Sequence, residues 1–85
     1  MKRMYGYKGF EVTVDLEASG YEGVWLLRPH GFLSFVRIKS AGATDDAFKP
    51  ISLMAAGQRP FATEAGAFAA GYSAAQHLID DTVVL

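Results

Sequence analysis

The chain contains no cysteine among its 85 residues. This absence excludes a disulfide framework, a thiol nucleophile and a zinc site built on thiolates. No stretch reaches the roughly 18 consecutive apolar residues of a membrane-spanning helix. Residues 1–8 begin with charge and lack the apolar centre of a signal peptide. These features together predict a cytoplasmic protein.

Basic residues are missing from the last part of the chain. All eight Lys and Arg residues lie between Lys2 and Arg59, whereas the charges that follow are Glu64, Asp80 and Asp81. The formal net charge is -1, which argues against a polyanion as the main partner. Any basic surface therefore belongs to the N-terminal part of the protein.

What the chain does contain is enough apolar material for one small domain. Hydrophobic residues make up 51% and charged residues 20% of the sequence. Intrinsic disorder needs the opposite balance, with low hydrophobicity and high net charge. The length fits a single domain over residues 1–85.

Alternation of apolar and polar side chains over residues 10–17 predicts a strand with one buried face. Gly9 is expected to host a bulge that brings this strand into phase with the tyrosines before it. Turns are expected at Ser19-Gly20 and over residues 28–31. They would separate further strands at 23–27 and 32–39, which would then form a hairpin. Residues 48–54 form either a fourth, shorter strand, which Pro50 restricts to the sheet edge, or an irregular extended segment.

A C-terminal helix is predicted from Thr63, its N-cap, to about Asp80. Apolar residues at spacings of three and four should face the sheet, namely Ala65, Phe68, Tyr72, Ala75 and Ile79. The flank with Ala67, Ala70 and Ala74 should face outward. Gly71 costs about 1 kcal/mol in a helix interior, so close packing of its backbone is the expected reason for it. The predicted class is α+β, an antiparallel sheet of three or four strands with one helix on one face, in the order β-β-β-(β)-α.

The predicted strands at 23–27 and 32–39 carry apolar side chains on both faces, although a single helix covers only one. Either loops and residues 1–8 cover the second face, or that face binds a partner. In the second case the anchors would be Trp25, Leu27, Leu33 and Phe35, because aromatic and large apolar groups dominate interface energies. The leading hypothesis is a non-catalytic protein–protein interaction module, whose partner is another protein or a second copy.

Nucleic-acid binding is the alternative hypothesis. Lys2 and Arg3 could join a basic patch on the sheet side formed by Lys8, Arg28, His30, Arg37 and Lys39. The segment 30–37 shares a glycine–aromatic start with RNA-recognition strands. Its two aromatic residues, Phe32 and Phe35, should however point to opposite faces of the strand.

No residue pattern in the chain predicts catalysis, a metal or another cofactor. Ser73 follows glycine and tyrosine as in a nucleophile elbow, but that motif needs a strand-to-helix turn, and Ser73 lies within the predicted helix. His77, Asp80 and Asp81 share a helix face by spacing, although acidic residues at a helix end commonly serve solubility. We therefore expect a protein that is not an enzyme.

Two resemblances accompany these patterns. The order of three strands and a long alanine-rich helix resembles the second part of the double-stranded-RNA-binding domain, which implies RNA as a partner. Where that family places phosphate-gripping lysines, this chain has Ala62, Thr63 and Glu64. The segments Tyr7-Lys8-Gly9-Phe10, 61–64 and 74–80 are similar to a group of small uncharacterised bacterial proteins, which implies no particular activity.

Overall fold

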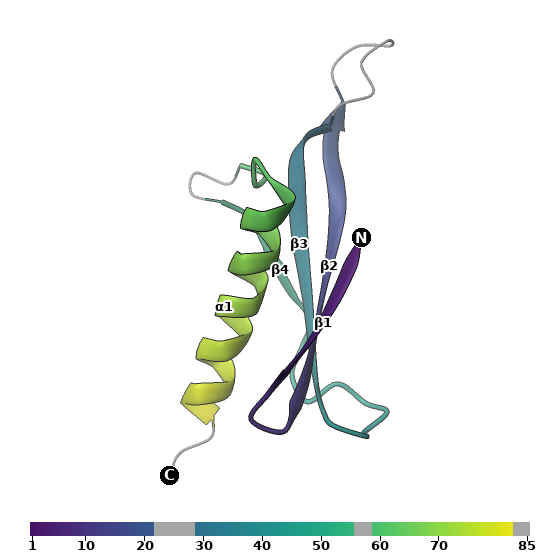
Figure 1. Ribbon diagram of the computed structural model, residues 1–85, viewed down its shortest axis with the longest axis vertical. Helices are drawn as coiled ribbons and strands as arrows, with labels where there is room; N and C mark the ends of the chain where they lie inside the picture. The colour runs from purple at the N-terminus through teal and green to yellow at the C-terminus, as the bar shows by residue number, and fades with distance from the viewer. Residues whose placement is uncertain (22–28, 56–58, 83–85) are drawn as a thin grey trace.

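The computed structural model describes residues 1–21, 29–55 and 59–82. It consists of an antiparallel sheet of four strands in the order β1-β2-β3-β4, followed by one helix that packs on one face (Figure 1). The strands are β1 (Lys2–Tyr7), β2 (Phe10–Tyr21), β3 (Pro29–Ser40) and β4 (Ile51–Leu53), and the helix is α1 (Glu64–Thr82). The predicted α+β class, with its single C-terminal helix, is confirmed.

A tight turn at Lys8 and Gly9 joins β1 to β2. Both residues have positive φ, 48° and 83°, and Tyr7 pairs directly with Phe10 across the turn. Positive φ at both central residues is typical of the type I′ turn, whose twist suits a two-residue hairpin. The predicted bulge at Gly9 was therefore wrong, because the phase changes at a chain reversal and not within one strand.

The pairing of β3 also differs from the prediction. Ser19 and Gly31 lie opposite each other within the β2–β3 ladder, and Tyr21 pairs with Pro29. The turns predicted at Ser19-Gly20 and from Pro29 to Gly31 were wrong, as was the hairpin partner of the strand at 32–39. The strand predicted at 23–27 falls on residues outside the described part.

Gly31 has a packing role where a turn was expected. A side-chain carbon at this position would collide with the backbone oxygen of Phe61. With glycine at position 31, Phe61 can approach this strand and form two backbone hydrogen bonds of 2.8 Å with Phe32. Glycine is needed here because the segment before α1 passes directly over this strand.

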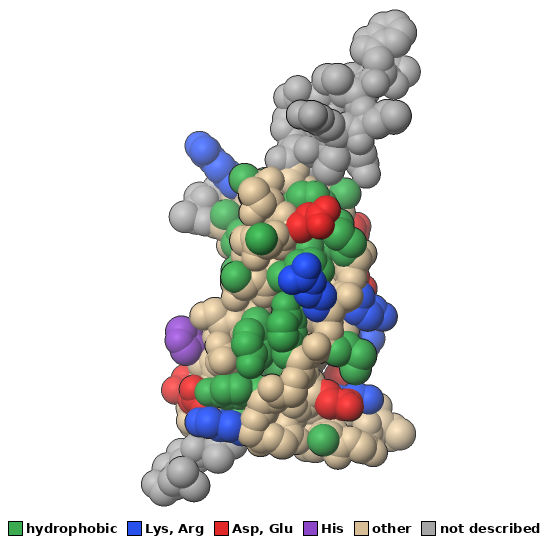
Figure 2. All heavy atoms as spheres, in the orientation of Figure 1, with side chains coloured by type: hydrophobic (Ala, Val, Ile, Leu, Met, Phe, Trp, Pro, Cys, Tyr) green, Lys and Arg blue, Asp and Glu red, His purple; other side chains and the backbone are tan. Residues whose placement is uncertain are grey.

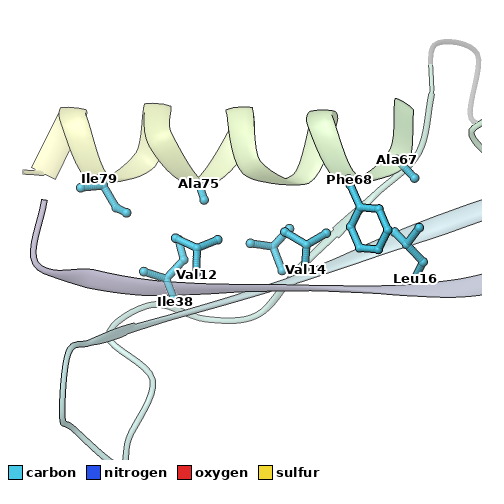
Figure 3. Close-up of a cluster of buried hydrophobic side chains, with 9 residues drawn as sticks. Val12, Val14, Leu16, Ile38, Ala67, Phe68, Ala75 and Ile79 are labelled. Atoms are coloured by element: carbon cyan, nitrogen blue, oxygen red, sulfur yellow. The ribbon is translucent and has the colours of Figure 1, made fainter. Parts of the chain in front are cut away.

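The core lies between α1 and the face of the sheet that carries Val12, Val14, Val36 and Ile38 (Figure 3). The helix contributes Ala67, Phe68, Gly71, Ala75 and Ile79. The prediction was right for Phe68, Ala75 and Ile79. It was wrong for Ala65, which is exposed, and for Ala67, which is fully buried.

The start of α1 is capped as predicted, since the Thr63 hydroxyl accepts a hydrogen bond of 3.0 Å from the backbone N–H of Gly66. Gly71 lets the helix approach the sheet closely, as expected. A Cβ there would lie 2.6 Å from Val14 and 2.7 Å from the hydroxyl of Ser34. The rotation of the helix is set by this close approach, which places Ala67 inward along with Gly71. Ser73 is exposed on the outer side.

Candidate functional site

The face of the sheet that α1 leaves uncovered, called the open face here, carries alternate residues of three strands. In the register, Thr13 lies between Met4 and Arg37, and Asp15 lies between Lys2 and Phe35. Because successive side chains of a strand point to opposite faces, these residues all face away from the helix. The set comprises Lys2, Met4, Glu11, Thr13, Asp15, Glu17, Leu33, Phe35, Arg37 and Lys39.

A groove of about 700 Å³ lies on this face. It is lined by Lys2, Thr13, Asp15, Phe35, Arg37, Lys39, Thr44, Asp45, Asp46 and Pro50. The loop over residues 41–50 forms one of its walls. Backbone hydrogen bonds hold this loop at two points, from Ala41 to Gly9 at 2.9 Å and from Ala47 to Ile38 at 2.7 Å. The groove therefore has a floor of paired strands and a wall tethered on both sides.

Charges of both signs line the groove, and two of its basic side chains pair with nearby carboxylates. Lys39 Nζ lies 3.3 Å from Glu11 Oε2, and Arg37 Nε lies 3.5 Å from Asp46 Oδ2. The Arg37 side chain remains 67% exposed. Exposed ion pairs of this kind contribute little to stability, so a partner can replace them at low cost.

Phe35 supplies the aromatic surface of the groove. It is half-buried on the open face, while Phe32 of the same strand points to the helix side and packs on the core. This confirms that the two aromatic residues lie on opposite faces. Leu33, also half-buried, lies on the same face as Phe35. The other two predicted protein-binding residues, Trp25 and Leu27, lie outside the described residues.

The basic residues proposed for nucleic acid do not gather in one place. Arg37, Lys39 and Lys2 line the groove. Lys8 instead binds Asp80 at the end of α1, with 2.6 Å between Nζ and Oδ1, and Arg3 lies over the Phe68 ring at 4.4 Å. His30 lies in β3, and Arg28 is outside the described residues.

A second polar cluster joins the β1–β2 turn to the end of α1. The Tyr7 hydroxyl donates to both carboxylate oxygens of Asp80, at 2.8 and 2.9 Å. Hydrogen bonds from Lys8 and then Tyr7 lower the pKa of Asp80. The same contacts raise the pKa of Tyr7 and of Lys8. By its spacing Asp80 was expected to share a helix face with His77 and Asp81, whereas in the structure it holds the β1–β2 turn against the helix.

Asp80 thus makes a structural contact, and within the described ranges no group of three or more His, Asp or Glu side chains is placed to hold a metal ion.

The contribution of residues 44–46 and Pro50 to the groove was not expected from the sequence. One available signal was the pair Asp45-Asp46 shortly after the basic residues of β3. Two neighbouring aspartates do not by themselves predict that residues 41–50 fold back over the open face of the sheet.

Among the described residues, no helix is both long and apolar enough to cross a membrane. Comparison of the chain with protein-family models, with curated proteins and with solved structures finds no match.

Proposed function

We propose that this protein is a small non-catalytic interaction module, and that its open-face groove receives an extended segment of a partner protein. The observation that supports the proposal best is the placement of Phe35, a half-buried aromatic side chain in a groove whose rim carries charges of both signs. Protein interfaces commonly combine a central aromatic anchor with a polar, solvated rim.

The pattern of charge favours a protein segment over a nucleic acid. Three basic side chains line the groove, and three carboxylates, those of Asp15, Asp45 and Asp46, line it with them. Binding to a phosphate backbone draws its affinity from an excess of basic side chains. A peptide that carries both signs of charge can instead exchange partners with the ion pairs already present, such as Arg37–Asp46.

Site-specific photo-cross-linking in cells tests this function. The photoreactive residue p-benzoylphenylalanine replaces Phe35 in one version of the protein and exposed Ser73 on α1 in a control version. We expect discrete protein adducts at position 35 only, and competition by excess unlabelled protein. A competitor carrying Arg37→Glu and Phe35→Ser should compete poorly while remaining folded by circular dichroism. Equal adduct patterns at both positions, or none at position 35, would contradict the proposal.

Fluorescence anisotropy with labelled single- and double-stranded RNA is a second experiment, which tests whether the groove binds nucleic acid. The proposal predicts no binding at low salt. Salt-dependent binding that is lost with Arg37→Ala and Lys39→Ala would instead assign the groove to nucleic acid.

A further inference from the structure

The outer edge of β1 is unpaired within the described part of the protein, since β1 ends the strand order. The backbone N–H of Leu16 binds the oxygen of Met1, which sets the phase of the β1–β2 ladder. Residues at odd positions of β1 therefore bond to β2, and those at even positions point their N–H and C=O groups outward. The outward residues are Lys2, Met4 and Gly6, so this edge can accept another strand.

Basic residues usually protect an edge strand from such pairing. Lys2 and Arg3 act in this way against most registers of two antiparallel β1 strands. Centring the pair on Arg3 sets two arginines opposite each other, and centring it on Tyr5 sets Lys2 opposite Lys8. The register centred on Met4, which pairs residues 2–6 of one copy with the same residues of the other, avoids this repulsion. When the pair is centred on Met4, Lys2 lies opposite Gly6 of the second copy.

The side chains also suit the register centred on Met4. Met4 is 63% exposed, and the space beside Gly6 is empty out to 4 Å. Arg3 would lie opposite Tyr5 of the second copy, an arrangement that allows a cation–π contact. Directly opposite side chains of this kind are the main source of stabilisation between paired strands.

The surface beside β1 adds apolar area. Tyr5 stacks on Tyr72 of α1 with 4.3 Å between ring centroids, and Tyr7 meets the same ring edge-on. Figure 2, seen from the side on which β1 lies in front, shows hydrophobic side chains gathered along the seam between α1 and β1. The helix packs mainly on β2 and β3, which leaves the outer side of β1 accessible.

We propose that two copies of this protein associate through antiparallel pairing of their β1 strands, centred on Met4. The two four-stranded sheets then form one continuous sheet, with both helices on the same face. The two open-face grooves stay on the opposite face. This dimer does not depend on the proposed function, because it uses the edge of β1 and not the groove. Cross-linking at Phe35 could therefore fail while the β1 strands still pair.

Sedimentation equilibrium from about 10 μM to 1 mM, the range expected for a small interface, measures the association. Met4→Pro removes an outward N–H that the β1–β2 ladder does not use, so it should leave a folded monomer. Met4→Ala keeps that N–H and is the matched control. We expect it to retain dimerisation, with a smaller loss of affinity than the proline variant.

Charge changes at Gly6 provide a test that separates dimerisation from folding. Gly6→Lys sets two lysines opposite each other in the dimer and should raise its Kd about tenfold. Within one copy the new lysine faces Glu11 across the strand, which favours the fold. Gly6→Glu should lower the Kd, and adding Lys2→Glu to Gly6→Lys should restore dimerisation. A monomer at 1 mM, or a dimer that neither Met4→Pro nor Gly6→Lys weakens, would overturn the proposal.

Discussion

Gly71 of α1 approaches Val14 of β2 so closely that a Cβ at position 71 would lie 2.6 Å from Val14 Cγ1. The hydroxyl of Ser34 would be 2.7 Å away on the neighbouring strand. All three residues are buried between the helix and the sheet. The spacing between helix and sheet, and with it the set of helix residues that are buried, depends on the absence of a side chain at this position.

Gly71→Ala should therefore destabilise the protein, although alanine is the better helix former. The gain in helix propensity stabilises the protein by about 1 kcal/mol, whereas overpacking costs about 1–3 kcal/mol, so we expect a net loss of up to about 2 kcal/mol in urea unfolding. Ala69→Gly, at an exposed position of α1, measures the propensity alone. If Gly71→Ala were stabilising by the amount that Ala69→Gly is destabilising, the close contact would be refuted.

Ser34→Ala should leave the free energy of unfolding unchanged or raise it by up to about 1 kcal/mol. The Ser34 hydroxyl is fully buried and has no hydrogen-bond partner among the described residues. Its removal relieves the cost of an unsatisfied polar group. Ser52→Ala, at the exposed position of β4, serves as the control and should change stability by less than about 0.5 kcal/mol. A clear loss with Ser34→Ala alone would reveal a partner for the hydroxyl. In the Gly71→Ala background, Ser34→Ala should restore part of the lost stability.

The contact of Asp80 with Tyr7 and Lys8 should make stability depend on pH at both extremes. Because the folded state lowers the pKa of Asp80, the stability gained from its charge is complete above the ordinary value of about 4 and is lost as the pH falls through the folded-state value. The raised pKa values of Tyr7 and Lys8 act in the opposite sense. Their contribution is complete below about pH 10 and is lost as the pH rises through the folded-state values.

Asp80→Asn should thus lower stability at neutral pH and have progressively less effect in acid. Thermal unfolding followed from pH 2 to 7, roughly the range in which an aspartate titrates, measures the difference from the unchanged protein. Asp81→Asn, at the next and exposed position of α1, is the matched control. If the two variants lose the same stability at every pH, the contact at Asp80 makes no net contribution.

Gly9→Ala should destabilise the β1–β2 hairpin by about 1 kcal/mol, since Gly9 has a φ of 83° that side-chain-bearing residues seldom adopt. Gly6→Ala is the comparison, because its side chain would enter open space. We expect Gly6→Ala to be neutral or to stabilise by a few tenths of a kcal/mol. Denaturant unfolding of both variants checks the turn type, and an equal response of the two would argue against it.

Local structure follows from the residue pattern wherever one face of an element is buried. The alternation over residues 10–17 places Val12 and Val14 in the core, and the spacing of Phe68, Ala75 and Ile79 defines most of the buried helix face. The Thr63 cap follows equally from local chemistry. These features need only the period of an element and the hydrogen bonds of its own backbone.

The pairing of the strands and the distance between the helix and the sheet depend instead on contacts between elements. The dipeptide Lys8-Gly9 reverses the chain, whereas Ser19-Gly20 continues a strand, because the long ladder between β2 and β3 outweighs a weak local turn preference. Gly31 and Gly71 look alike in sequence, yet one accommodates the backbone of Phe61 and the other the side chain of Val14. The groove needs loop 41–50 to fold back beside Phe35, and such a contact depends on packing that no local pattern encodes.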